Sequence, residues 1–197
     1  MASETKQRVI YAAMRLFAEK GYQATSISEI AREAQANSGS VYFFFPTKQE
    51  ILLAVLDTYC EGIESMLLQP AWENIGDPLD RIFALLDRYR MLLVESECRY
   101  GCPIGILALE LHEPDPAVRE RLGANFEKWT AAIEQCLRDA GDRMTSRVNP
   151  RDLATFVLTT MEGAVMQART YRQPEAFDAS IRVLKDYFSH LIQPSSK

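Results

Sequence analysis

Histidine is scarce in this chain, and its cysteines are not arranged in pairs. The two histidines, His112 and His190, lie far apart in the sequence. No C-x-x-C pair occurs among the four cysteines, which are Cys60, Cys98, Cys102 and Cys136. A structural zinc site requires about four such ligands gathered by short spacings. The sequence therefore indicates no metal site and no cofactor, and in a reducing compartment it predicts four free thiols.

Long apolar runs and catalytic motifs are also missing. No run approaches the roughly 20 apolar residues that a membrane-spanning helix needs. The N-terminal stretch MASETKQRVIYAAM lacks the apolar core of a signal peptide. We therefore expect a cytoplasmic protein that makes no membrane contact. The motifs H-E-x-x-H and G-x-S-x-G, a glycine-rich phosphate loop and paired histidines are all absent, which argues against an enzyme.

Positive charge is modest and unevenly distributed. The 197 residues carry a net charge of −5, with 47% hydrophobic and 25% charged residues, which is typical of a globular chain that can bury a good core. Residues 1–48 contain six Lys or Arg against four Glu, so that segment has a net charge of +2 and the remainder −7. A mildly basic segment joined to an acidic one can still attract phosphate locally.

Strand patterns are absent as well, because no stretch alternates polar and apolar residues between turn signals. Apolar residues instead recur at helical spacing, as Ile10, Ala13, Met14 and Phe17 do. This pattern predicts an all-α fold with about nine helices. We expect these helices at about residues 4–20, 26–34, 38–44, 47–68, 79–97, 104–112, 117–139, 150–171 and 174–191.

Residues 21–52 contain the most specific pattern in the chain. Residues 26–34 begin with a hydroxyl N-cap and place apolar residues on one helical face. Gln35, Ala36 and Asn37 interrupt this pattern for about one turn, and residues 38–44 can form a second short helix. Val41 and Phe44/Phe45 should face the core. Two short helices joined by such a turn place the second helix in a DNA major groove.

This segment resembles the N-terminal DNA-binding domain of the TetR family of bacterial transcriptional regulators. The resemblance covers about residues 10–52 and depends on Gly21-Tyr22, Thr25-Ser26-Ile27, Ile30-Ala31, Ala34, Gly39-Ser40-Val41-Tyr42, Phe45, Thr47-Lys48 and Leu52. Two positions at the turn depart from the family pattern: Gln35-Ala36 replaces the usual Gly-Val, and Asn37 replaces a common serine. Beyond this segment only the length and the helical character match. The resemblance implies a helix-turn-helix domain at residues 1–48 and a helical domain for effector binding and dimerisation at residues 49–197.

The resemblance and the side-chain chemistry together indicate a set of DNA-binding residues. They are Thr25, Ser26, Asn37, Ser38, Gly39, Ser40, Tyr42, Phe43 and Lys48. The resemblance implies phosphate contacts for Tyr42 and Lys48, and a phenol hydroxyl and a lysine at a helix start suit that role. Residues at the start of the second short helix, which reach furthest into the groove, would contact bases.

Several of these residues have a second interpretation. Asn37 either pairs with a base or caps the helix that follows it, and at least one of Thr25 and Ser26 caps a helix instead of contacting phosphate. Phe43 either contacts a thymine methyl group or packs against the first helix, and packing is favoured. Gly39 costs about 1 kcal/mol relative to alanine inside a helix. Close approach of its backbone to DNA or to the preceding helix would explain its presence.

The last two expected helices, at about 150–171 and 174–191, indicate a homodimer. The final helix carries apolar residues on two faces, the second of which includes Val183, Tyr187 and Ile192. A helix pair with a surplus apolar face at the end of a chain commonly packs against its own copy. The resemblance implies the same four-helix contact.

An effector site can be inferred only by analogy with the family, which implies a cavity for a small, mostly apolar molecule. The candidate lining residues are Leu86, Tyr89, Cys102, Leu107, Phe126, Trp129 and Met161. For each of them an ordinary core position is the alternative. Cys102, between Gly101 and Pro103, is either a reactive thiol with Cys98 as its partner or a buried packing residue, and packing is favoured.

These features predict a ligand-responsive transcriptional regulator. The simplest form is a homodimeric repressor that binds a pseudo-palindromic operator in double-stranded DNA and that an effector releases. The alternative is a helical small-molecule-binding protein or enzyme without a DNA function. The presence of both Tyr42 and Lys48 argues against a loss of DNA binding.

Overall fold

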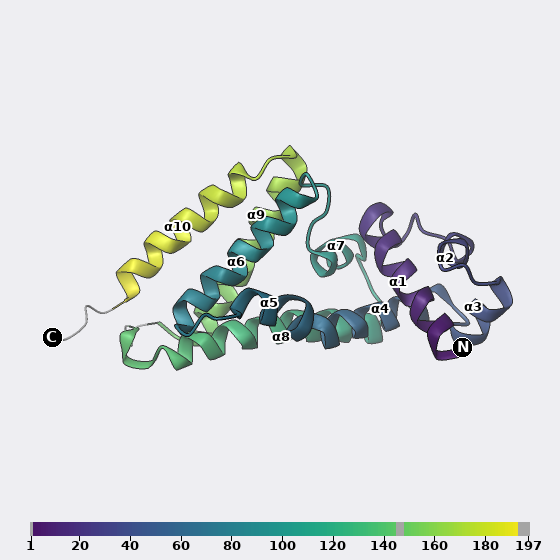
Figure 1. Cartoon of the computed structure of the whole chain (residues 1–197), viewed down its shortest axis with the longest axis horizontal. Coiled ribbons are helices and arrows are strands. Elements are labelled where there is room, and N and C mark those ends of the chain that lie inside the picture. The colour runs from purple at the N-terminus through teal and green to yellow at the C-terminus, as the bar shows by residue number, and fades with distance from the viewer. Residues whose placement is uncertain (1, 145–147, 193–197) are drawn as a thin grey trace. The chain divides into compact units, whose positions relative to one another are not determined.

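The computed structural model describes residues 2–144 and 148–192 and confirms the all-α fold (Figure 1). Its helices are α1 (Ala2–Lys20), α2 (Ile27–Glu33), α3 (Ser38–Phe44), α4 (Lys48–Ile63), the π-helix η1 (Glu64–Leu68), α5 (Gln69–Trp72), α6 (Pro78–Glu95), α7 (Pro103–Glu110), α8 (Pro116–Asp139), the 3₁₀-helix η2 (Gly141–Arg143), α9 (Pro150–Tyr171) and α10 (Glu175–Leu191). No helix in the described ranges is long and apolar enough to span a membrane.

The chain folds into two compact units, and their boundaries do not coincide with the expected division at residue 48. One unit contains the described residues up to Glu61 together with Cys102–Asn125. The other contains Gly62–Gly101 and the described chain from Phe126 onward. In the first unit α7 packs on α1. A segment from far along the sequence therefore completes the unit that contains the helix-turn-helix.

The core of the first unit is built on the apolar face of α1. Ile10, Ala13, Met14 and Phe17 are all buried, as their helical spacing predicted. Helices α1, α2 and α3 pack on one another (Figure 1), and α2, α3 and α4 add buried residues that include Ile30, Ala31, Val41, Ile51 and Leu52. Each large apolar side chain buried in this way stabilises the fold by about 1.5–3 kcal/mol.

Helix α4 does not end as the sequence suggested. We expected one α-helix over residues 47–68, ended by Pro70. The chain instead passes through the π-helix η1 and continues as α5 to Trp72. In the π-turn the Gln69 N–H bonds to the Glu64 carbonyl five residues back. Pro70 has no N–H to donate and would crowd the carbonyl four residues before it in a regular α-helix, so the wider turn accommodates it.

The second unit contains α6 packed against α9 and α10. Helices α9 and α10 form a hairpin whose turn contains Arg172 in the left-handed conformation, at φ 57°. Its buried residues include Leu153, Val157 and Met161 from α9 and Phe177, Ile181, Leu184 and Phe188 from α10. A bidentate ion pair joins α6 to α10, with Arg90 Nε 2.6 Å from one oxygen of Asp178 and Nη2 2.9 Å from the other. These contacts hold α9 and α10 as a fixed surface.

Candidate DNA-binding surface

Helix α2 begins with a complete capping box. The Ser26 hydroxyl accepts a hydrogen bond from the Glu29 N–H, and the Glu29 carboxylate accepts one from the Ser26 N–H at 2.9 Å. Lys20 at the end of α1 also contacts Glu29, at 2.8 Å. The hydrogen bond from Lys20, followed by those from Ser26, lowers the pKa of the half-buried Glu29 to about 2. Ser26 is therefore a helix cap in this structure.

The turn between α2 and α3 forms without the glycine that the family pattern usually has there. Gln35 adopts the left-handed conformation, at φ 49°, and Ala36 N–H bonds to the Ala31 carbonyl at 2.9 Å. Asn37 then caps α3, because its Oδ1 accepts the Ser40 N–H at 2.7 Å. Asn37 is also exposed, so its amide nitrogen still faces solvent at the start of the helix.

Helix α3 exposes one side of its first two turns. Ser38, Gly39, Tyr42 and Phe43 are exposed and Ser40 is half-buried. Val41 and Phe45 are buried as expected, whereas Phe44 is only half-buried. The favoured interpretation of Phe43 as packing against α1 is wrong: its side chain is 80% exposed, and its ring meets that of its neighbour Phe44 at 5.1 Å between centroids. Its position on the outward side of this short helix leaves no core surface within reach.

Gly39 is not required for close packing inside the protein. A Cβ atom built there would lie 3.5 Å from Asn37 Oδ1 and within 4 Å of nothing else. Of the two explanations that the sequence offered, close approach to α2 is therefore excluded. Close approach of its backbone to DNA stays a prediction.

Thr25 is placed inside the protein. Its side chain is 1% exposed, and its hydroxyl donates to the Gly21 carbonyl at 2.7 Å. The hydroxyl group is thus already used and has no access to a DNA backbone. Thr25 holds the loop of residues 21–25, which joins α1 to α2.

Lys48, the first residue of α4, contacts the same loop. Its ammonium nitrogen lies 2.9 Å from the Tyr22 carbonyl, 3.0 Å from the Thr25 carbonyl and 3.4 Å from the Gln23 carbonyl. It also lies 4.3 Å from the centroid of the Tyr22 ring, in cation–π contact. The side chain that the sequence assigned to a phosphate therefore binds backbone carbonyls in the structure.

Glu110, the last residue of α7, binds the other side of this loop. Its two carboxylate oxygens accept the Tyr22 N–H at 2.8 Å and the Gln23 N–H at 2.7 Å. Burial, and then the Glu110 charge, raise the pKa of the Tyr22 phenol. No sequence signal indicated this contact, since Glu110 and Tyr22 are 88 residues apart.

The expected effector residues are divided between the two units. In the second unit Leu86, Tyr89, Trp129 and Met161 are buried and Phe126 is half-buried, and the rings of Tyr89 and Trp129 meet at 5.3 Å between centroids. Cys102 and Leu107 are buried in the first unit. Cys102 caps α7, with its sulfur 3.5 Å from the Gly105 nitrogen, and none of the four cysteines, all within the described residues, forms a disulfide. Its burial agrees with the packing interpretation.

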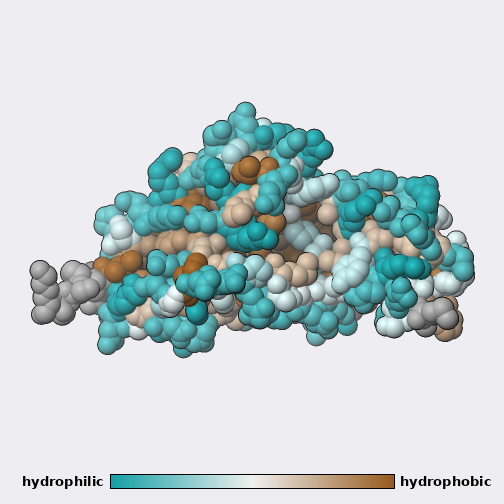
Figure 2. All heavy atoms as spheres, viewed as in Figure 1, coloured by the Kyte–Doolittle hydropathy of each residue, from teal (hydrophilic) through white to brown (hydrophobic). Residues whose placement is uncertain are grey.

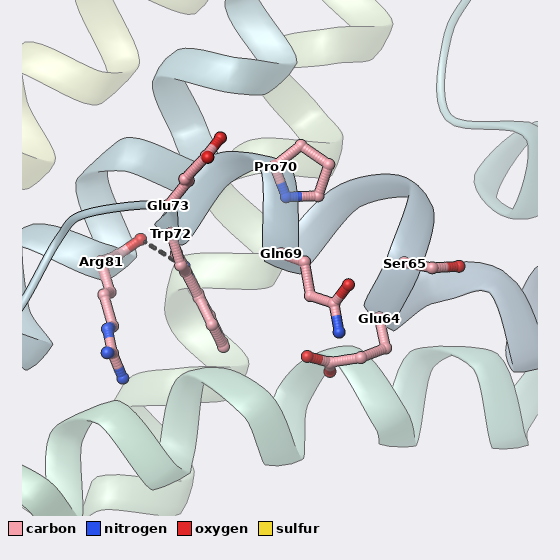
Figure 3. Close-up of a pocket in the computed structure, with 7 residues that line it drawn as sticks. All are labelled: Glu64, Ser65, Gln69, Pro70, Trp72, Glu73 and Arg81. Atoms are coloured by element: carbon pink, nitrogen blue, oxygen red, sulfur yellow. Dashed lines mark hydrogen bonds between the residues drawn. The ribbon is translucent and has the colours of Figure 1, made fainter.

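The second unit also has an open groove of about 550 Å³ along η1 and α5 (Figure 3). It is lined by Glu64, Ser65, Gln69, Pro70, Trp72, Glu73 and Arg81. Figure 3 shows the side chains of Glu64, Gln69 and Trp72 pointing to the same side, and the Trp72 indole N–H donates to the Arg81 carbonyl at 2.9 Å. None of the expected effector residues lines this groove, and its polar lining does not match a mostly apolar effector.

Comparison with known proteins agrees with this architecture at both ends of the chain. Residues 9–55 match the family described as bacterial regulatory proteins, tetR family, and residues 78–182 match the LmrA/YxaF-like transcriptional regulator C-terminal domain. The HTH-type transcriptional regulator YxaF of Bacillus subtilis is 28% identical over 85% of this chain and 86% of its own length. The HTH-type transcriptional repressor DhaR of Mycobacterium sp. is 24% identical over 91% of this chain and 89% of its own. A TetR transcriptional regulator from Chloroflexus aurantiacus has the same fold, with a TM-score of 0.84, 27% identity and 97% of both chains covered.

Proposed function

Because the chain belongs to the TetR family of bacterial regulatory proteins, we propose that this DNA-binding regulator is a homodimeric repressor that a small molecule releases from its operator. The observation that carries the proposal is the exposed side of α3, where Asn37, Ser38, Tyr42 and Phe43 present polar and aromatic side chains that no core contact requires. The repressor role is supported by the relative from Mycobacterium sp., which is named a repressor. Like other DNA-binding proteins of bacteria, it would act in the cytoplasm.

In this proposal the head, which is the helix-turn-helix of residues 1–48, contacts DNA mainly through α3. Asn37, Ser38, Ser40 and Phe43 lie toward base edges, where an amide pairs with adenine and a phenyl ring contacts a thymine methyl group. The Tyr42 hydroxyl donates to a phosphate. Thr25 and Ser26 contribute by holding the start of α2, since their hydroxyl groups are used within the protein. This assignment is tested by asking which duplexes the full chain selects from the DNA that flanks its own gene.

Gly39→Ala should separate stability from DNA binding. The added methyl group meets only Asn37 Oδ1 and removes the flexibility of glycine, so the free energy of unfolding should rise by about 0.5–1 kcal/mol. If the backbone at residue 39 lies against DNA, operator affinity should fall by about tenfold, comparable to the loss of one good base contact. Urea unfolding and fluorescence anisotropy on a selected duplex measure the two effects.

Gly123→Ala is the matched control for this change. Gly123 lies in α8, and a Cβ atom added there would have no other atom within 4 Å, so the substitution should stabilise the helix and leave DNA binding unchanged. Equal operator affinity for Gly39→Ala and the unchanged protein would exclude a close approach of α3 to DNA at this residue.

The proposed dimer uses the face of α9 and α10 that the unit leaves uncovered. Phe156, Met166, Val183 and Tyr187 are exposed there, and the rings of Phe156 and Tyr187 meet across the two helices at 5.9 Å. Figure 2 shows apolar atoms at the surface beside the C-terminal end of α10. An exposed apolar face on a rigid helix pair favours an isologous contact with a second copy. Two heads would then bind the two halves of a pseudo-palindromic operator.

The proposed effector site is formed by the apolar effector residues of the second unit, which include Tyr89 and Trp129. It is not the polar groove along η1 and α5. Release requires that the effector binds the DNA-free state more tightly than the DNA-bound state, and the coupling between effector and DNA is then reciprocal. The chain has two tryptophans, so Trp72→Phe leaves Trp129 as the only reporter and Trp129→Phe leaves Trp72 in the groove.

With 8-anilinonaphthalene-1-sulfonate as an apolar probe, we expect saturable quenching in Trp72→Phe and little in Trp129→Phe. The same probe concentration should weaken operator binding in an anisotropy titration, because the two ligands are linked. Quenching of Trp72 alone, together with operator release, would instead assign effector binding to the groove.

A further inference from the structure

The loop of residues 21–25 is held from both sides by charged side chains that lie far away in the sequence. Glu110 at the end of α7 binds its amide groups, and Lys48 at the start of α4 binds its carbonyl groups. Ser26, which caps α2, follows this loop directly, and α2 packs on α3. The position of the loop therefore determines where the helix-turn-helix begins.

On the amide side the geometry is specific. Two consecutive N–H groups, of Tyr22 and Gln23, point at one carboxylate, at 2.8 and 2.7 Å. Gly21 makes this approach possible, since it has φ +85° and a Cβ there would lie 2.9 Å from a Glu110 oxygen. Hydrogen bonds to an ionised acceptor are about twice as strong as neutral ones. Each of these two contacts therefore holds the loop more firmly than an ordinary turn bond.

On the carbonyl side, the ammonium group of Lys48 has no donor left. An ammonium group has three N–H donors, and three loop carbonyls lie within 2.9–3.4 Å of its nitrogen. The Tyr22 ring covers a further side of the group at 4.3 Å. A phosphate could bind Lys48 only if these contacts were lost.

We propose that Lys48 and Glu110 form a loop clamp and are positioning residues for DNA binding that do not themselves touch DNA. This inference rests on the DNA-binding function proposed above and replaces the phosphate contact that the sequence assigned to Lys48. The clamp ties the start of α2 to both α4 and α7, so the head keeps one orientation relative to these helices. Loss of either side chain leaves loop groups unpaired and lets α2 and α3 shift together.

Charge and position make opposite predictions for Glu110, and this separates the two mechanisms. If only charge mattered, removal of the Glu110 carboxylate, which lies beside the head, would strengthen binding to DNA. If the clamp matters, Glu110→Gln weakens binding, because an amide can accept from one loop N–H but turns its own NH₂ toward the other. For Lys48, a phosphate contact would contribute about 0.9 to the slope of log affinity against log salt, whereas a positioning role contributes nothing.

The test uses the full chain and a duplex that the unchanged protein selects, with anisotropy measured between low and high KCl at a temperature where circular dichroism shows every variant folded. We expect Lys48→Met and Glu110→Gln each to lower affinity by about tenfold to a hundredfold, as for charged hydrogen bonds, with an unchanged salt slope. Because Lys48 and Glu110 hold the same loop, the effects of the two substitutions should not add. The affinity of the double variant should be at most about threefold below that of whichever single variant binds more weakly. Glu113→Gln and Lys185→Met, which change the same charges outside the loop clamp, should bind like the unchanged protein.

Amide exchange measured by NMR gives a readout that does not depend on DNA. The Tyr22 and Gln23 amide protons should exchange at least about tenfold faster in Glu110→Gln and at the unchanged rate in Glu113→Gln. Unaltered exchange of these amide protons would overturn the loop clamp, whether or not a duplex had been selected. Failure to select any duplex would instead count against the proposed function alone. A fall of about one unit in the salt slope for Lys48→Met, with neutral or tighter binding for Glu110→Gln, would restore the phosphate contact.

Discussion

Val183→Glu should convert the dimer to a monomer and remove most of the operator affinity. Val183 is 67% exposed on α10, on the uncovered face that includes Phe156 and Tyr187. In a monomer the glutamate is solvated at little cost, whereas in a twofold contact two unpaired carboxylates would be buried. A single head also loses the gain from simultaneous contact with two half-sites, which is about 10²–10⁴ in affinity. Light scattering gives the mass, and anisotropy on the selected duplex gives the affinity.

Ala131→Glu provides the control for added charge. Ala131 is exposed on α8, and the same substitution there should leave both the mass and the operator affinity unchanged. If Val183→Glu remained dimeric and bound its operator normally, the contact between copies would have to use another surface, and the proposal for α9 and α10 would be wrong.

Gly21→Ala should be the most damaging small substitution in the head. The left-handed conformation at φ +85° costs a non-glycine residue roughly 1–2 kcal/mol. The added Cβ would also lie 2.9 and 3.0 Å from the two Glu110 carboxylate oxygens, so the carboxylate must move away from the Tyr22 and Gln23 amides. We expect the free energy of unfolding to fall by about 2–4 kcal/mol, from strain together with weakened charged hydrogen bonds. Urea unfolding followed by circular dichroism measures this change.

Gly76→Ala is the comparison for this prediction. Gly76 lies in the loop before α6, where a Cβ has open space around it, and its φ is not in the left-handed region. Its replacement should change the free energy of unfolding by less than about 1 kcal/mol, with stabilisation the favoured direction. A similar small change in Gly21→Ala would mean that the loop tolerates a side chain and that Glu110 binds it only weakly.

Local signals accounted for most of the helices. The face formed by Ile10, Ala13, Met14 and Phe17, the cap at Ser26 and the cap at Asn37 depend on neighbours within about four residues, and all appear in the structure. The π-turn at residues 64–68 was missed because its cause, the missing N–H of Pro70, is compatible either with a helix end or with a wider turn. Periodicity alone does not distinguish these two outcomes.

The roles of individual residues in the head depended on contacts that no local pattern contains. Lys48 reaches carbonyls 23 to 26 residues earlier, and Glu110 binds amides 87 and 88 residues earlier. For Thr25 the residue type was compatible with phosphate binding, but burial decided its role. For Phe43 the spacing was compatible with packing, but the outward side of a seven-residue helix offered no surface to pack on.

The composition of the first unit also bears on how readily family members can exchange their DNA-reading parts. A recombination event that transferred residues 1–48 alone would bring in a new loop at residues 21–25 but leave the recipient's residue 110 in place. The loop would keep its contacts with Lys48, but its Tyr22 and Gln23 amides would be paired only where the recipient supplies a carboxylate at position 110. The compact unit that contains the helix-turn-helix is discontinuous in sequence, since it is formed by the described residues up to Glu61 together with Cys102–Asn125. On the proposed loop clamp, a transferred helix-turn-helix would therefore keep its geometry only when both stretches of sequence change together.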